Sequence, residues 1–157
     1  MRMRVAPARF ASVSIALASA ALLLSAAPAR ADKVGVRTGV YTDAGKPFVG
    51  FELLLPISHS VYLNPNVEYV FIDDPAYLTF NADFHYDFHT HSRAYVWAGA
   101  GLGVIYQNPD GPAPSETDVG ANFLFGVGLK GDVIPYVQAK LLVKDDPEFV
   151  LGVGLRF

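Results

Sequence analysis

Phe149-Val-Leu-Gly-Val-Gly-Leu-Arg-Phe157, at the end of the sequence, alternates between two kinds of side chain. Successive side chains of an extended strand point to opposite faces. One face of this segment would carry only large apolar residues, namely Phe149, Leu151, Val153, Leu155 and Phe157. Such a face needs a cover in a soluble protein, whereas a strand that faces lipid needs none.

The same period of two recurs along the chain in segments of about ten residues. Residues that favour turns, mainly Gly, Pro, Asp, Asn and Ser, separate these segments. We predict strands over residues 33–42, 48–57, 60–72, 77–89, 94–107, 119–131, 134–144 and 149–157. No apolar stretch after Ala31 is long enough for a transmembrane helix. The pattern therefore predicts an all-β fold.

The segment 77–89 shows the two faces most clearly. One face would carry Leu78, Phe80, Ala82, Phe84, Tyr86 and Phe88. The other would carry Thr79, Asn81, Asp83, His85, Asp87 and His89. In every predicted strand the charged residues avoid the apolar face, and that face is rich in Phe and lacks Lys. The polar faces are narrow and rich in Gly, which suits a cramped interior, so we predict that the apolar faces point outward to lipid.

The N-terminal segment has the features of a secretory signal peptide. Arg2, Arg4 and Arg9 precede a short apolar run, and Ala29-Arg30-Ala31 provides a small-x-small cleavage site. We predict a signal peptide over residues 1–31, cleaved after Ala31, and one barrel domain over residues 32–157. Four of the 12 Lys and Arg and none of the 15 Asp and Glu precede residue 32, which leaves a net charge of −7. This charge argues against a nucleic-acid partner. The chain has no Cys, so the fold forms without disulfides.

Together these features resemble the small bacterial outer-membrane β-barrel superfamily, the OmpA- and OmpX-like barrels. The resemblance implies an eight-stranded antiparallel up-and-down transmembrane β-barrel in the cell outer membrane. It also implies that the barrel-insertion machinery reads the terminal segment 149–157. Both ends of the barrel would lie in the periplasm, and the odd-numbered connections, the longest from Asn108 to Asp118, would face outward. The expected partners are outer-membrane lipid and lipopolysaccharide, and we expect a monomer.

The inner face predicts a network of charges in the lumen. Its members are Arg37, Glu52, Glu68, Asp83, Asp87, Lys140 and Arg156. Enclosed charges are costly unless they are paired, so we expect ion pairs across the lumen. Arg37 and Arg156 would lie on neighbouring strands if the sheet closes. An eight-stranded barrel is just filled by its side chains, so we expect a structural or surface-interaction role without an open pore.

The outward connections are acidic. Asp73, Asp74, Asp145 and Asp146 could bind hard cations such as calcium. Solvated acidic loops explain them more simply, because no segment has EF-hand spacing. His85 and His89 would be about 13 Å apart along a strand, too far to share one zinc ion. The sequence therefore predicts neither a metal site nor a cofactor.

Two other functions fit parts of the pattern. A soluble periplasmic lipocalin-like carrier would need the faces reversed, with an apolar cavity inside. Some eight-stranded barrels are lipid A deacylases that use a Ser-His-Glu constellation. Ser58-His59-Ser60 and His91-Ser92 supply two of those residue types, but they lie in short turns with no matching acid, so we expect no enzyme. Pro65 predicts either a bulge or a break in the third strand.

Overall fold

The computed structural model describes residues 32–43, 45–71, 76–108 and 115–157. The predicted signal peptide lies outside the described residues. The eight strands are β1 (Lys33–Tyr41), β2 (Lys46–Pro56), β3 (Val61–Val70), β4 (Ala76–Phe88), β5 (Ala94–Asn108), β6 (Glu116–Leu129), β7 (Ile134–Val143) and β8 (Glu148–Arg156). Strands β5 and β6 extend further than predicted, so the connection expected over 108–118 is shorter, at 109–115.

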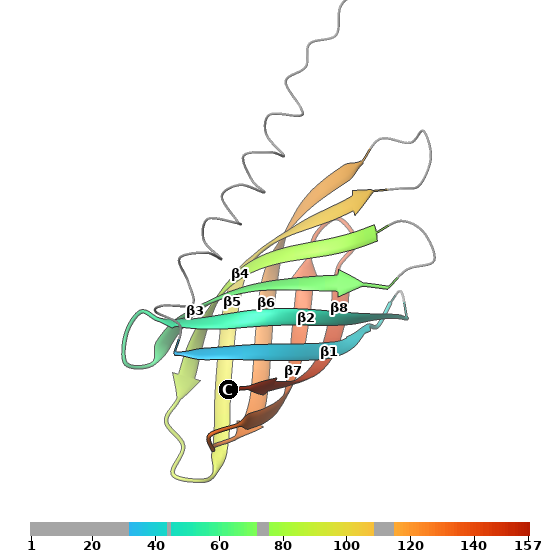
Figure 1. The fold of residues 1–157 in the computed structure, drawn as a ribbon. Coiled ribbons are helices and arrows are strands. Elements are labelled where there is room, and N and C mark those ends of the chain that lie inside the picture. The colour runs from blue at the N-terminus through green and yellow to red at the C-terminus, as the bar shows by residue number, and fades with distance from the viewer. Residues whose placement is uncertain (1–31, 44, 72–75, 109–114) are drawn as a thin grey trace, which may run out of the picture. The chain divides into compact units, whose positions relative to one another are not determined.

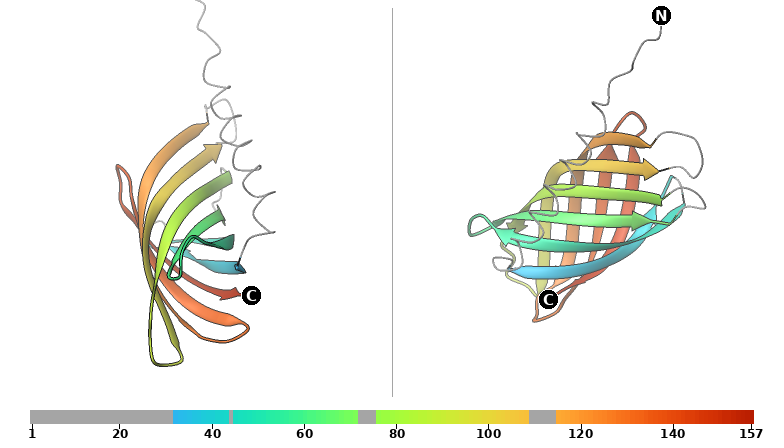
Figure 2. Two further views of the ribbon diagram at one scale, coloured as in Figure 1. Left: turned by 90° about the vertical axis from the view of Figure 1, so that its left-hand side faces the viewer. Right: turned by 45° about the horizontal axis from the view of Figure 1, so that its top comes forward.

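The strands form one closed antiparallel barrel in chain order, as Figures 1 and 2 show. Closure comes from the pairing of β8 with β1, which runs from Gly35↔Arg156 to Tyr41↔Val150. The backbone N–H of Phe157 adds a bond to the carbonyl oxygen of Val34 at 2.8 Å. Where all eight strands pair, the closed sheet leaves no strand edge, which is what a β-structure in lipid requires.

The side chains of every strand alternate between the barrel wall's outer face and its lumen. In β4, Phe84, Tyr86 and Phe88 are exposed on the outside, whereas Asp83 and His85 are buried inside. All five apolar residues of the terminal segment 149–157 are likewise exposed. This confirms that the apolar face points outward. Leu53 is an exception. Its position in the alternation of β2 predicts an outward side chain, but the residue is only 2% exposed.

Pro65 produces neither of the two predicted defects. β3 is continuous, and Pro65 pairs with Ala82 of β4. Towards β2 the ladder is interrupted between Glu52↔Asn66 and Leu55↔Leu63, with the same register on both sides, so no residue is inserted. The side-chain amide of Asn64 donates to the carbonyl oxygen of Leu53 at 2.8 Å. This side-chain bond satisfies an acceptor at the point where proline cannot donate.

Glycines on the inner face provide room for the largest lumen side chains. A Cβ atom on Gly126 would lie 2.1 Å from Cζ2 of Trp97. A Cβ atom on Gly154 would lie 2.5 Å from Cζ of Tyr136. The alternation of Gly with large residues is therefore a packing requirement of a narrow barrel.

Candidate functional site, the filled lumen

Glu68 is the centre of the first polar cluster in the lumen. Its carboxylate accepts from Nη2 of Arg37 at 2.5 Å and from Nζ of Lys140 at 2.8 and 2.9 Å. It also accepts from the hydroxyl groups of Tyr41 and, at 3.1 Å, Thr79. Two cations and two hydroxyls thus surround one buried carboxylate, which offsets the cost of removing these charges from water.

Glu52 is the centre of the second cluster. It accepts from Nε and Nη2 of Arg156 at 2.7 and 3.2 Å, and from the hydroxyl of Tyr136 at 2.7 Å. Nη1 of Arg37 lies 3.8 Å from the same carboxylate. Arg37 and Arg156, predicted on neighbouring strands, therefore share Glu52, and Arg37 links the two clusters.

Asp83 and Asp87 lie on the inner face, but neither takes part in an ion pair among the described residues. Asp83 accepts from the side-chain amides of Asn66 at 2.9 Å and Asn122 at 2.8 Å. Asp87 accepts from the hydroxyl of Tyr95 at 2.6 Å. The expectation of ion pairing is wrong for these two. Neutral amides from nearby strands satisfy both oxygens of Asp83, whereas Oδ1 of Asp87 has no partner among the described residues.

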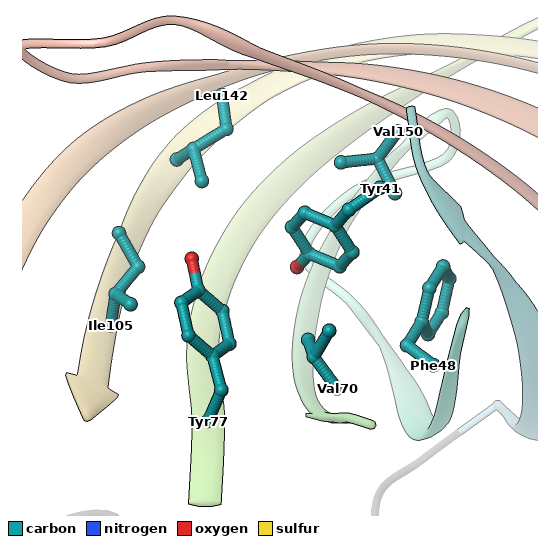
Figure 3. Close-up of a cluster of buried hydrophobic side chains, with 7 residues drawn as sticks. All are labelled: Tyr41, Phe48, Val70, Tyr77, Ile105, Leu142 and Val150. Atoms are coloured by element: carbon teal, nitrogen blue, oxygen red, sulfur yellow. The ribbon is translucent and has the colours of Figure 1, made fainter. Parts of the chain in front are cut away.

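An apolar cluster fills the lumen at the end where β1 finishes and β2 begins (Figure 3). It consists of Tyr41, Phe48, Val70, Tyr77, Ile105, Leu142 and Val150. These side chains come from seven strands and point into the barrel. The sequence pattern predicted a polar interior, so this apolar cluster was not expected. Each of its residues occupies one of the alternate positions of its strand that point into the lumen. This alternation was the signal that could have assigned them to the interior.

Aromatic residues fill the other end of the lumen. The buried indole of Trp97 packs against Tyr136, Tyr95 and Leu124. The guanidinium carbon of Arg156 lies 4.3 Å from the ring centre of Trp97 and 4.5 Å from that of Tyr136. Arg156 therefore combines an ion pair with contacts to two rings, an arrangement for which the planar guanidinium is well suited.

The other predicted site residues lie outside the lumen. The terminal residues Phe149, Leu151, Val153, Leu155 and Phe157 form part of the outer wall. Asp145 and Asp146 are exposed in the connection between β7 and β8. Asp73 and Asp74 lie outside the described residues. The residues that the structure describes contain no group of three or more His, Cys, Asp or Glu that could hold a metal ion.

The candidate catalytic residues are not assembled. Ser92 accepts a hydrogen bond from the backbone N–H of Ala94, and Lys130 donates to the carbonyl oxygen of Ser92 at 3.1 Å. Within the described ranges, no serine hydroxyl donates to a histidine. The arrangement of these residues is that of turns held by local hydrogen bonds.

The described part of the chain also lacks any helix with the length and apolar character needed to cross a membrane. No protein-family model matches the sequence, and no curated protein matches it.

Solved structures do resemble the barrel. The N-terminal β-barrel domain of Pseudomonas aeruginosa OprF is 17% identical, with a TM-score of 0.59, over 81% of this chain and 98% of that one. Neisserial surface protein A is 15% identical, with a TM-score of 0.58, over 79% of this chain and 92% of that one. The outer membrane enzyme PagL is 16% identical, with a TM-score of 0.55, over 80% of this chain and 98% of that one.

These likenesses concern the fold. The outer wall is apolar, and the lumen holds charges, amides and aromatic rings. A lipocalin-like carrier would require an apolar cavity instead, so the faces are not reversed. The chain has the closed eight-stranded fold seen in the small bacterial outer-membrane β-barrels, with its apolar side chains exposed on the outer face.

Proposed function

We propose that this chain is a non-enzymatic integral protein of the outer membrane whose barrel conducts no solutes and serves as a rigid support for its surface connections. The observation that carries this proposal is the filled lumen. An apolar cluster occupies one end, an aromatic cluster the other, and two carboxylate-centred networks lie between them. A lumen filled by side chains suits a barrel without a pore better than a channel.

The orientation supports a surface role. We propose that the connections after β1, β3, β5 and β7 face outward, so that both ends of the barrel lie in the periplasm. The connection over 109–115 would then be outside, in keeping with the long outer loops and short inner turns of membrane barrels. Lipid and lipopolysaccharide would surround the apolar wall, and the barrel would act as a monomer.

The exposed aromatic pairs near the two ends of the wall support this placement. Tyr69 and Phe71 lie near the end of β3, with ring centres 5.1 Å apart. Tyr86 and Phe88 lie near the end of β4, at the opposite end of the barrel, with ring centres 5.2 Å apart. Membrane barrels carry aromatic girdles at both interfaces, where the ring is partly in lipid and partly hydrated.

Conductance across a planar lipid bilayer tests the filled lumen. The purified barrel should give no stable channel openings under conditions in which an open porin, added as a positive control, conducts. Regular openings in several independent preparations would contradict the proposal. Incubation with purified lipid A, followed by mass spectrometry, tests the absence of hydrolase activity. Release of a fatty acid at a rate that scales with protein concentration would favour the enzyme instead.

A further inference from the structure

One edge of β6 is open at the end of the barrel that we propose faces outward. Towards β5, β6 pairs along its whole length, beginning at Gln107↔Glu116. Towards β7, pairing begins only at Ala121↔Val143. In the part of the chain that the structure describes, residues 116–120 thus have a strand on one side only. β6 is the orange strand in Figures 1 and 2.

The open edge borders a cleft of about 290 Å³. Its lining residues are Asp118, Val119, Lys144, Asp145 and Asp146. The β6 edge forms one wall, and the connection between β7 and β8 forms the other. Nζ of Lys144 lies 3.9 Å from a carboxylate oxygen of Glu148, which partly neutralises the one cation of the cleft. The three aspartates leave the cleft negatively charged.

An open strand edge offers unpaired N–H and C=O groups to another extended chain. The aspartates determine which chain would fit, because they attract Lys and Arg and repel acidic segments. Val119, which is 65% exposed, adds an apolar contact on the strand itself. A second copy of this edge is a poor partner, since antiparallel self-pairing would bring Glu116 and Asp118 of one copy close to those of the other.

We propose that the open edge of β6 binds an extended basic polypeptide segment by strand addition. The backbone of the segment pairs with residues 116–120, and its Lys or Arg side chains contact Asp118, Asp145 and Asp146. This inference deepens the proposed surface role and rests on it, because the partner reaches the edge from outside the cell. Acidic residues on an edge strand also prevent edge-to-edge aggregation, and the experiment must separate that role from binding.

The test uses the full barrel in nanodiscs of zwitterionic lipid, so that a basic peptide has no anionic membrane to bind. The probe is a fluorescent ten-residue peptide of alternating Lys and Val. One control peptide has Glu in place of Lys, and another has N-methylated backbone amides at alternate positions. Fluorescence anisotropy should show saturable binding of the first peptide and no binding of either control.

Charge variants locate the site. The triple variant Asp118→Asn, Asp145→Asn, Asp146→Asn should bind the peptide about tenfold more weakly, the change expected from losing several exposed ion pairs. The double variant Asp145→Asn, Asp146→Asn should also bind more weakly. Its matched double variant, Asp32→Asn, Asp132→Asn, makes the same change in net charge at exposed positions away from the cleft and should bind like the unmodified barrel. Equal weakening in both variants, or in neither, would overturn the proposal.

Cross-linking provides an independent location, because the chain contains no Cys. A Val119→Cys barrel should form a disulfide with a Cys-containing version of the peptide, whereas a Val133→Cys barrel should not. Equal cross-linking at both positions would overturn the proposal. The proposal would also be overturned if the triple variant self-associated and the unmodified barrel bound no peptide. The acidic residues would then serve only to prevent edge-to-edge aggregation. These readouts do not depend on conductance, so a failure here is distinguishable from a failure of the closed lumen.

Discussion

Lys140 of β7 and Glu68 of β3 form an ion pair across the full width of the barrel. The two strands are separated by three others in either direction around the closed sheet. Nζ of Lys140 nevertheless lies within 2.8 and 2.9 Å of the two carboxylate oxygens. The pair therefore joins opposite walls, and with Arg37 it links three strands through one carboxylate.

The first prediction concerns loss of that carboxylate's charge. Glu68→Gln preserves the shape of the side chain but leaves Arg37 and Lys140 buried around a neutral group. Breaking a buried ion pair from one side costs about 3–5 kcal/mol, so the variant should unfold at a lower urea concentration in phospholipid vesicles. Glu68→Ala should also lower the thermal stability in detergent.

The exposed Glu116 provides the control for this prediction. Glu116→Gln removes the same charge and should change the free energy of unfolding by less than about 0.5 kcal/mol. A double variant, Glu68→Gln with Lys140→Met, should recover part of the loss, because one unpaired cation is also removed. Equal stability of Glu68→Gln and Glu116→Gln would show that the network contributes nothing.

The second prediction tests the planar geometry of Arg156. Arg156→Lys retains the positive charge but cannot contact Glu52 in a bidentate manner or cover the rings of Trp97 and Tyr136 equally well. The free energy of unfolding should fall by about 2 kcal/mol, a magnitude typical of charged hydrogen bonds and desolvated cation–π contacts. Arg93→Lys, in an exposed turn, should have no measurable effect. A similar loss in both variants would contradict this role.

The third prediction uses the chain's single tryptophan. The buried indole of Trp97 lies directly over Gly126, where an added Cβ would come within 2.1 Å. Gly126→Ala should displace the indole, shift its fluorescence emission to longer wavelength and increase quenching by acrylamide. Gly152→Ala is the matched strand control, since its nearest contact would be Cζ of Phe48 at 3.3 Å. Unchanged emission in Gly126→Ala would show that the packing of this end of the lumen is wrong.

Much of the barrel was predictable because a strand has a period of two. The alternation placed Asp83 inside and Phe84 outside without any knowledge of strand pairing, and the turn residues placed most strand ends within a few positions. The C-terminal segment showed which face was apolar. Local sequence was sufficient for these features because each depends on one strand at a time.

The contacts inside the lumen could not be predicted in the same way. The partners of Asp83 depend on which residues of neighbouring strands lie at its level, which is set by the register around the closed sheet. Ile105 and Leu142 could be assigned to the lumen from their inward parity, but their meeting at one level of the lumen depends on the same register. The open edge of β6 also depends on register, because the first residues of β6 extend beyond the last residue of β7.

The fourth prediction concerns the outer wall. Leu102 is 62% exposed within β5, and Leu102→Arg would place a charge against the membrane core. Arginine on the lipid face costs about 2–4 kcal/mol at the bilayer midplane and about 0–1 kcal/mol near the interfaces. Val133→Arg, in the connection after β6, should therefore be tolerated. Urea titrations of both variants in vesicles measure the difference, and equal costs would mean that Leu102 does not face lipid.

The most direct measurement is electrophoresis of separated soluble, inner-membrane and outer-membrane fractions, with boiled and unboiled samples compared. A closed membrane barrel resists the detergent until it is heated, because the backbone hydrogen bonds of its membrane-spanning wall are made within the sheet. We predict that the protein is found in the outer-membrane fraction and that its mobility changes on boiling. Protein in the soluble periplasmic fraction, with the same mobility before and after boiling, would contradict the placement of this barrel in the outer membrane.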